Sequence, residues 1–419
     1  MPKINRYRED APQERASRYG WVIVAVGALL MAVCHAGVFS CASLFVKPVC
    51  EGLGFSRSAF SAYQTIASLS SIVFSPVMGR IVAGSKTKRV LLLSLLLLVL
   101  DFAGFALASH LWQFYVLGIL QKLAYAGVGM LPVSILVNNW FGPQKKGLAI
   151  SLAYAGSGVG GIVLSPLVTK VILHYGWRGG YLFLGLLALC VLPVAAVWVV
   201  RTPEERGLHR VGDCPEASKA PTMGMTAREA THSALFWFLM ISLFLNNMAC
   251  CSVLSQGPAY YSDIGFTAMQ AAQIVSVAAA FLTLGKIVLG VMHDKLGDGK
   301  AVAVGTAMIL AEFFCLYQLA YNRMFLAPYM LSYGLAMAVG TVSVPLITAA
   351  FFGDRDYGAI VGMVNATVNL GNAVGPLVAA RIYDTTGSYG AAWLLMIGVG
   401  AAALLTLLPC FGLRKKQNY

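Results

Sequence analysis

The run AMQAAQIVSVAAAFLTLGKIVLGVM, residues 268–292, contains a single charged side chain, Lys286. The run is long enough to cross a hydrocarbon core of ~30 Å as a helix. An ammonium group in such surroundings costs roughly 2.5–3.5 kcal/mol on insertion scales, so a chain rarely retains one without a use. The sequence therefore indicates a membrane helix in which Lys286 holds an anion partway across the bilayer. The structural alternative is a lysine that extends to the nearer membrane interface.

Comparable apolar runs recur along the 419-residue chain, of which 58% is hydrophobic and 11% is charged. A soluble domain requires far more polar surface. The 43 glycines are typical of membrane helices that pack backbone against backbone. We therefore predict an all-α membrane protein in the lipid bilayer, with twelve transmembrane helices. The expected spans are about 20–46, 58–82, 89–108, 111–139, 147–173, 179–200, 233–260, 268–292, 301–320, 324–352, 358–382 and 389–411.

The net charge of +13 follows this topology. Of the 30 Lys and Arg residues, 22 fall on one side of the predicted membrane, six fall on the other, and Lys122 and Lys286 lie inside spans. Because positive charge concentrates on the cytoplasmic side, both termini are predicted to be cytoplasmic. The basic excess thus indicates a multi-pass protein of the cell (plasma or inner) membrane and argues against a nucleic-acid partner.

The two halves of the chain resemble each other at an offset of 211 residues. Gly54-Phe55-Ser56 opens span two, and Gly265-Phe266-Thr267 opens span eight. Three further landmarks agree: Gly79 with Gly290, Phe141-Gly142 and Gly147 with Phe352-Gly353 and Gly358, and, with a slip of one residue, Pro166 with Pro376. A shared register of this kind indicates an internal duplication.

The polar stretch 201–231 separates the two sets of six spans. We expect a cytoplasmic tail at 1–18, an N-terminal six-helix half at 19–200, the cytoplasmic linker at 201–231, a C-terminal six-helix half at 232–412 and a cytoplasmic tail at 413–419. Two similarly oriented halves predict a pseudo-symmetric transporter with its site between them near mid-membrane.

Several phrases within this pattern are more specific. They are Tyr19-Gly20-Trp21, Gly54-Phe55-Ser56-Arg57-Ser58, Trp140-Phe141 with Lys146-Gly147-Leu148-Ala149, the glycine-rich segment 155–161, and Tyr175-Gly176-Trp177-Arg178. With them, the chain from Tyr19 to Phe411 resembles a transporter of the major facilitator superfamily, and in particular its bacterial monocarboxylate-porter and oxalate/formate-antiporter branch. The resemblance implies a twelve-helix transporter of a small organic anion.

The resemblance also implies roles for two residues. In that branch an arginine four residues before the glycine of the span eight–nine motif holds the substrate carboxylate, and Lys286 stands four residues before Gly290. Lysine keeps the charge but lacks the planar fork of arginine. Tyr333 in span ten inherits a hydrogen-bonding role toward the substrate, with helix packing as the alternative.

Lys122 is the second cation inside a span, and the offset pairs it with Tyr333. It is either a second contact for the anion or the partner of Asp101 in span three, and the sequence leaves both open. The offset also pairs His35 in span one with Asn246 in span seven. We expect both to line the cavity, and His35 to be a candidate carrier of a coupling proton. The alternative is a neutral histidine bonded to a neighbouring helix.

Span eleven carries a polar stripe of Asn365, Asn369 and Asn372 on one helix face. Such a stripe faces water or another helix rather than lipid. Asn369 is a candidate substrate contact, and helix packing is the alternative. For Glu312 in span nine the sequence names no partner.

By the resemblance, Gly79 and Arg80 after span two, and Gly290 and Asp294 after span eight, belong to gating motifs. Ala83 stands where the superfamily usually has an aspartate, which normally stabilises one state of the gate. We therefore expect the two gates to differ in how strongly each favours that state. Two further positions depart from relatives: Val364 replaces the second cation of the oxalate/formate antiporters, and Leu282 replaces an aspartate of the animal monocarboxylate carriers.

No nucleophile–base pair, nucleotide-binding element or Cys/His ligand spacing is visible in the sequence. We therefore predict a protein that is not an enzyme, needs no cofactor or metal, and draws its energy from a gradient. The expected function is secondary active transport of a lactate- or pyruvate-like monocarboxylate by a monomer, through proton symport or anion exchange. The alternatives are a dicarboxylate/formate-type anion antiporter, a drug or metabolite exporter on the same fold, and a sensor that binds an anion without counterflow.

Overall fold

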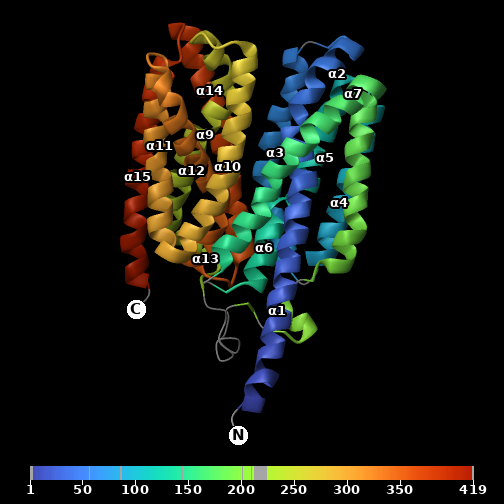
Figure 1. The fold of residues 1–419 in the computed structure, drawn as a ribbon, viewed down its shortest axis with the longest axis vertical. Coiled ribbons are helices and arrows are strands. Elements are labelled where there is room, and N and C mark those ends of the chain that lie inside the picture. The colour runs from blue at the N-terminus through green and yellow to red at the C-terminus, as the bar shows by residue number, and fades with distance from the viewer. Residues whose placement is uncertain are drawn as a thin grey trace. The chain divides into compact units, whose positions relative to one another are not determined.

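The computed structural model describes residues 3–55, 57–84, 87–142, 145–200, 202–208, 210–211 and 224–417, and these are almost entirely helical (Figure 1). Two compact units divide the chain, one made of residues 1–223 with 357–362 and the other of residues 224–356 with 363–419. The division falls inside the predicted linker 201–231, of which residues 201, 209 and 212–223 lie outside the described ranges.

Span one begins the first unit and changes helix type partway along. The helices of this unit are α1 (Lys3–Leu30), the π-helix η1 (Met31–Ser40), the 3-10 helix η2 (Ala42–Phe45), α2 (Val46–Leu53), α3 (Arg57–Ala83), α4 (Thr87–Leu107), α5 (Leu111–Val128), α6 (Met130–Trp140), α7 (Lys146–Trp198) and the 3-10 helix η3 (Pro203–Arg206). Within α7, Gly176 adopts φ 73° and ψ 175°, a backbone conformation that favours glycine. This break separates predicted spans five and six.

The second unit repeats the arrangement of long apolar helices. Its helices are α8 (Ala227–His232), α9 (Ala234–Asp263), α10 (Ala268–Leu296), α11 (Asp298–Leu319), the 3-10 helix η5 (Arg323–Phe325), α12 (Leu326–Ala338), the π-helix η6 (Val339–Ser343), α13 (Val344–Phe352), α14 (Tyr357–Thr386) and α15 (Gly390–Gln417). The first six residues of α14 are grouped with the first unit.

Capping residues explain where two of these helices begin. The Thr226 hydroxyl accepts from the N–H of Glu229 at 3.2 Å, and the Thr226 N–H donates to the Glu229 carboxylate at 2.8 Å, which starts α8. The same hydrogen bonds hold the pKa of Glu229 below its usual range. Thr267 and Gln270 form an equivalent capping box at the start of α10.

The prediction of a twelve-helix membrane fold is confirmed. Ten helical segments are long and apolar enough to cross a membrane, and one of them, Lys146–Trp198, holds two spans on either side of Gly176. The twelfth span is α14, which has 30 residues but is not among the ten. Its asparagine stripe makes it more polar than the others.

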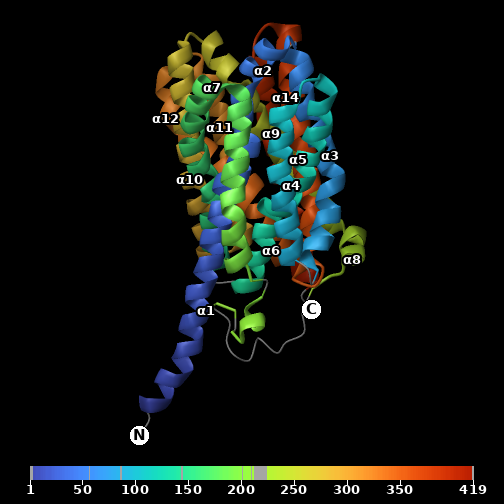
Figure 2. The same cartoon turned by 90° about the vertical axis from the view of Figure 1, so that its right-hand side faces the viewer.

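Each unit packs its helices in the same order. In the first, α5 packs against α3 and α4, and α4 also packs against α7 (Figure 2). In the second, α12 packs against α10 and α11, and α11 also packs against α15. Corresponding spans thus make corresponding contacts, as an internal duplication requires.

One close helix crossing is also duplicated. A Cβ atom on Gly160 of α7 would overlap the main-chain carbonyl of Ala32 in η1, and a Cβ on Gly371 of α14 would lie 2.6 Å from the carbonyl of Phe244 in α9. Gly160 and Gly371 are 211 residues apart. Small residues at these positions let the two backbones touch, which is how membrane helices gain packing energy.

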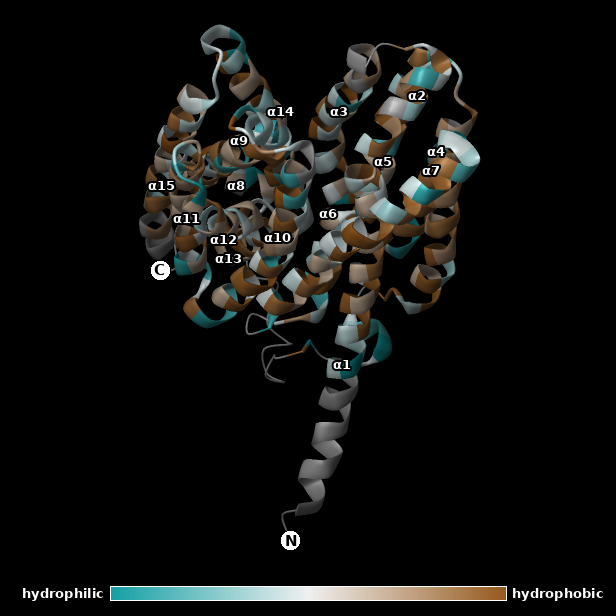
Figure 3. Ribbon diagram, turned by 45° about the horizontal axis from the view of Figure 1, so that its top comes forward, coloured by the Kyte–Doolittle hydropathy of each residue, from teal (hydrophilic) through white to brown (hydrophobic). Residues whose placement is uncertain are grey.

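The outward faces of the helices carry large apolar side chains. Leu93, Leu100 and Leu107 lie along one face of α4, and each is more than half exposed, as is Leu405 of α15. Figure 3 shows such hydrophobic positions in brown along the helices. A soluble protein seldom exposes so much apolar surface, so these faces contact lipid.

Candidate functional site

Lys286 lies in α10 inside the second unit, and 4% of its surface is exposed. A lysine that reached along its helix to the membrane interface would leave its ammonium group uncovered. The observed burial therefore disagrees with the interfacial alternative. A buried ammonium group must be compensated by polar or anionic groups, because desolvation of its charge is costly.

Two glycines bring the backbones of α10 and α12 together at the level of Lys286 and Tyr333. A Cβ on Gly285 of α10 would overlap the main-chain carbonyl of Gly334 of α12. Lys286 follows the first glycine, and Tyr333 precedes the second. Tyr333 is also buried, and its ring centroid is 6.0 Å from that of Tyr329, one turn away on α12. The structure thus brings these two predicted residues to the same level of the second unit.

Asn246 of α9 is 1% exposed, and neither its amide nitrogen nor its amide oxygen has a hydrogen-bond partner among the described residues. Its neighbour Asn247 behaves differently, because the Asn247 amide donates to the carbonyl of Leu243 at 2.8 Å. A buried amide without partners costs free energy, which is tolerated at sites where a ligand supplies the missing bonds.

Asn369 lies on α14 and is half-buried, as are Asn365 and Asn372 on the same face. This exposure fits either alternative for the stripe, contact with the substrate or contact with a neighbouring helix. The structure does not place Asn369 at the Gly285–Gly334 crossing.

Lys122 and His35 belong to an aromatic cluster in the first unit. The Nζ atom of Lys122 lies 3.7 Å from the ring centroid of Phe39, a cation–π contact. The His35 ring stacks on Phe39 with centroids 4.7 Å apart, and His35 Nδ1 forms a 2.7 Å hydrogen bond with the Tyr125 hydroxyl. The structure therefore joins the two predicted residues through Phe39 and Tyr125, which the sequence analysis did not single out.

Lys122 does not pair with Asp101. Both carboxylate oxygens of Asp101 are buried and without a hydrogen-bond partner within the described ranges. The residue of α5 that interacts with Asp101 is Gln121. The alternative in which Lys122 neutralises Asp101 is therefore wrong, and the ammonium group instead faces an aromatic ring.

Three spans become irregular close to the predicted site residues. His35 lies in the π-helix η1, span four breaks at Gly129 between α5 and α6, and span ten becomes π-helical in η6, which contains Gly340. Gly129 and Gly340 are 211 residues apart, so the same position is irregular in both halves. Discontinuous and π-helical segments are frequent at functional sites. This pair of glycines was a signal in the sequence that could have predicted the breaks.

The predicted gating residues lie near helix ends. Gly79 and Gly290 are buried, Arg80 is exposed and Asp294 is half-buried.

The residue before Asp294, His293, was not singled out from the sequence, but it joins three helical segments. Its Nδ1 lies 2.8 Å from Asp298 Oδ1 at the start of α11, and its Nε2 lies 2.8 Å from the Ser343 hydroxyl in η6.

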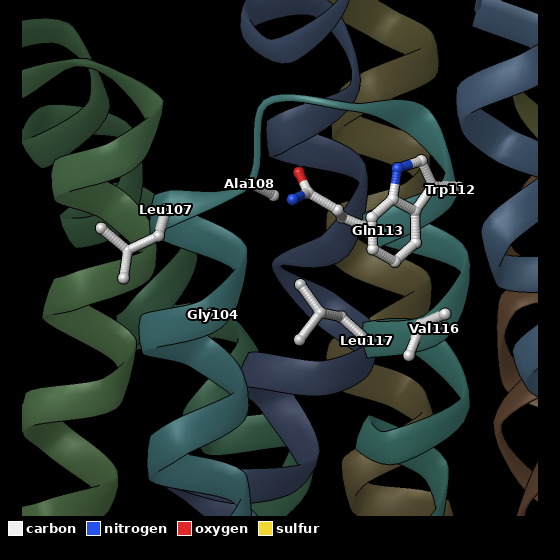
Figure 4. A pocket seen from close by; sticks show the side chains of 7 residues that line it. All are labelled: Gly104, Leu107, Ala108, Trp112, Gln113, Val116 and Leu117. Carbon is white, nitrogen blue, oxygen red and sulfur yellow. The ribbon is translucent and has the colours of Figure 1, made fainter.

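A cavity of about 260 Å³ opens at the turn between α4 and α5 (Figure 4). Its lining is mostly apolar: Gly104, Leu107, Ala108, Trp112, Gln113, Val116 and Leu117. The one polar side chain, Gln113, already accepts hydrogen bonds from the N–H groups of Ser109 and His110. None of the predicted substrate residues lines this cavity, and it offers no charge to an anion.

Comparison with protein families settles which transporter fold this is. Residues 28–348 match the family model described as the Major Facilitator Superfamily. The chain belongs to the Major Facilitator Superfamily. It is 28% identical to monocarboxylate transporter 12 of Homo sapiens, over 94% of this chain and 80% of that protein. It is 25% identical to the oxalate:formate antiporter of Oxalobacter formigenes, over 70% of this chain and 68% of that protein.

Solved structures agree on the fold. The proton:xylose symporter XylE superposes with a TM-score of 0.74 at 15% identity, covering 94% of this chain and 96% of that one. The two relatives named above support the monocarboxylate-porter and oxalate/formate-antiporter branch of the superfamily, whereas XylE shows the fold alone. The protein is thus a multi-pass membrane transporter related to monocarboxylate transporters and anion antiporters, and it is not an enzyme.

Proposed function

We propose that this protein is a secondary active transporter of a small organic monocarboxylate, lactate- or pyruvate-like, which it moves by alternating access. The observation that carries the proposal is the buried ammonium group of Lys286, four residues before Gly290 in α10. A single carboxylate carries one negative charge, which would offset the positive charge of this group. Tyr333, on the other side of the Gly285–Gly334 crossing, is suited to donate a hydrogen bond to the same anion.

Asn246, His35, Lys122 and Asn369 complete the proposed set of substrate contacts. Asn246 contributes an amide that has no hydrogen-bond partner in the part of the chain that the structure describes. His35 contributes a ring nitrogen or N–H, although its Nδ1 is already bonded to Tyr125. In the gating motifs, we propose that Gly79, Arg80, Gly290 and Asp294 form the turns that change during the transport cycle.

The position of Lys122 favours a monocarboxylate over a dicarboxylate. Its ammonium group lies against the face of Phe39, whose quadrupole already offsets part of the positive charge. A second carboxylate would have to compete with this contact. The residue Val364, where the oxalate/formate antiporters carry a second cation, agrees with a singly charged substrate.

Reconstituted counterflow tests the substrate class. Liposomes loaded with lactate, pyruvate, formate, oxalate or malate would be assayed for exchange of the labelled compound, with the wild type and with Lys122→Gln. We expect the wild type to exchange lactate or pyruvate and little oxalate or malate. We expect Lys122→Gln to exchange the same compounds more slowly, because it lacks one proposed substrate contact. Preferred exchange of a dicarboxylate, abolished by Lys122→Gln, would support the antiporter alternative. Export of amphipathic drugs without any carboxylate exchange would support the exporter alternative.

We further propose that the protein acts as a monomer in the cell (plasma or inner) membrane, with both termini in the cytoplasm. The excess of Lys and Arg on one side of the spans supports this orientation. Labelling of single cysteines added at each terminus, by a reagent that does not cross membranes, tests it. Labelling in intact cells would contradict the orientation, while labelling only after lysis is expected.

A further inference from the structure

Both units bury a carboxyl group at the same position of the internal repeat. Asp101 of α4 is 3% exposed and Glu312 of α11 is 0% exposed, and the two residues are 211 apart in the sequence. Across the described ranges, no side chain or backbone group forms a hydrogen bond with any of the four carboxyl oxygens. Neither residue is a predicted substrate contact, so the site described above leaves both unexplained.

A carboxylate in such surroundings is very unfavourable, because burial removes the water that stabilises its charge and no cation replaces it. The group avoids this cost by carrying a proton as a neutral carboxylic acid. A buried, unpaired carboxyl group of this kind is therefore a natural site for a proton that is taken up and released as the protein changes conformation.

The surroundings of Glu312 are suited to proton movement. Four titratable groups lie within electrostatic reach of it: Cys250 and Tyr261 of α9, and Tyr329 and Tyr333 of α12. Three of these are phenols, whose hydroxyl groups both donate and accept hydrogen bonds. The Tyr261 and Tyr329 hydroxyls already share a hydrogen bond of 2.6 Å.

These phenols extend from one end of the second unit to the level of the predicted anion site. Tyr261 lies two residues before the end of α9, and Tyr329 lies three residues after the start of α12. Tyr333 is one turn further along α12 and directly precedes Gly334, which contacts Gly285 of α10. The three phenols thus follow one another from the helix ends to Tyr333, which is a predicted substrate contact.

The corresponding group in the first unit lacks this connection. Asp101 interacts with Tyr63 of α3, Tyr181 of α7 and the amide of Gln121 in α5. At the position that corresponds to Tyr333 stands Lys122, which faces Phe39 and does not approach Asp101 as a partner. Asp101 therefore serves as a matched control for Glu312, with similar burial but without the row of phenols that leads to the anion site.

We propose that Glu312 binds the proton that accompanies the carboxylate substrate, which makes the transporter a proton symporter. This inference rests on the proposed function. One proton from water joins a carboxylate oxygen of Glu312 to give the carboxylic acid, one anion binds at Lys286, and both are released on the other side of the membrane. No electrons are exchanged, and the cycle moves one negative and one positive charge together, so it is electroneutral.

Two transport assays on the full chain in liposomes test this assignment. Counterflow of labelled lactate requires no net proton movement, whereas uptake driven by an inward proton gradient does. We expect Glu312→Gln to retain counterflow and to lose proton-driven accumulation, and Asp101→Asn to retain both. Accumulation by Glu312→Gln at the wild-type level would overturn the proposal, and so would a wild type whose lactate uptake does not respond to an inward proton gradient. A wild type with no counterflow of any monocarboxylate would instead contradict the proposed function.

A measurement on the wild type keeps the proposal testable even if Glu312→Gln does not fold. Dicyclohexylcarbodiimide adds to protonated carboxyl groups in apolar surroundings, and peptide mass spectrometry locates the product. We expect modification of Glu312 that decreases as the pH rises and that slows when lactate is present. An unmodified Glu312 in a peptide that is otherwise detected would overturn the assignment.

Discussion

Gly285 of α10 lies directly against the main-chain carbonyl of Gly334 in α12, so closely that a Cβ on Gly285 would overlap it. This contact brings the backbones of α10 and α12 together one residue from both Lys286 and Tyr333. In a helix interior, Gly→Ala ordinarily stabilises by ~1 kcal/mol. Here we expect the opposite sign, because the added methyl group forces α10 and α12 apart at a cost of about 1–3 kcal/mol.

Thermal unfolding in detergent checks this expectation. Gly285→Ala should lower the melting temperature, and lactate counterflow should fall with it. Gly398→Ala in α15 is the matched control, because a Cβ at Gly398 would meet no atom within 4 Å. That variant should unfold at or above the wild-type temperature. Equal melting temperatures for the two variants would contradict the close crossing.

Asn246→Leu should raise the stability of the protein and weaken its binding of the substrate. The buried amide of Asn246 has no hydrogen-bond partner among the residues that the structure describes, and leucine has the same branched shape. Replacing an unsatisfied polar group by an apolar one should stabilise the protein by about 1 kcal/mol. The same change should raise KM, because the substrate loses a hydrogen-bonding partner.

The comparison variant is Asn247→Leu, which removes a formed hydrogen bond to the Leu243 carbonyl and should not stabilise the protein. Melting temperature and KM for lactate would be measured for both variants. A lower melting temperature for Asn246→Leu would mean that its amide is already satisfied in the membrane.

The contact between Lys122 and Phe39 should be measurable as a coupling energy. Phe39→Leu removes the ring beneath the ammonium group, and Lys122→Met removes the charge. A double-mutant cycle on unfolding free energy should give a coupling of about 0.5–2 kcal/mol, the range of partly buried cation–π pairs. Additive effects of the two substitutions would show that the ring does not stabilise the charge.

The sequence predicted the features that depend on length, composition and repetition. Apolar runs predicted all twelve spans, because only helices and closed barrels satisfy backbone hydrogen bonds in lipid, and runs of about 20 apolar residues are typical of helices. The 211-residue offset predicted the duplication, which the packing of each unit repeats. The same offset pairs Asp101 with Glu312, although from the sequence Glu312 had no assigned partner.

Side-chain partners were harder to predict, because they depend on how each helix is rotated. Successive residues of a helix point about 100° apart, so Gln121 and Lys122 cannot both face Asp101. The sequence alone could not decide which of them does. The π-helix η1 also changes the direction in which the following side chains of span one point, and this places Phe39 beneath Lys122. Hydrophobic periodicity in the sequence does not reveal this change.

Counterflow of labelled lactate by Lys286 variants in liposomes tests the central claim most directly. Lys295, exposed near the end of the same helix, supplies the control Lys295→Gln. We predict that Lys286→Gln lowers exchange at least about tenfold, equivalent to ~1.4 kcal/mol. Lys286→Arg should keep part of the activity, and Lys295→Gln should match the wild type. Exchange by Lys286→Gln at the wild-type rate would contradict an anion site at this residue.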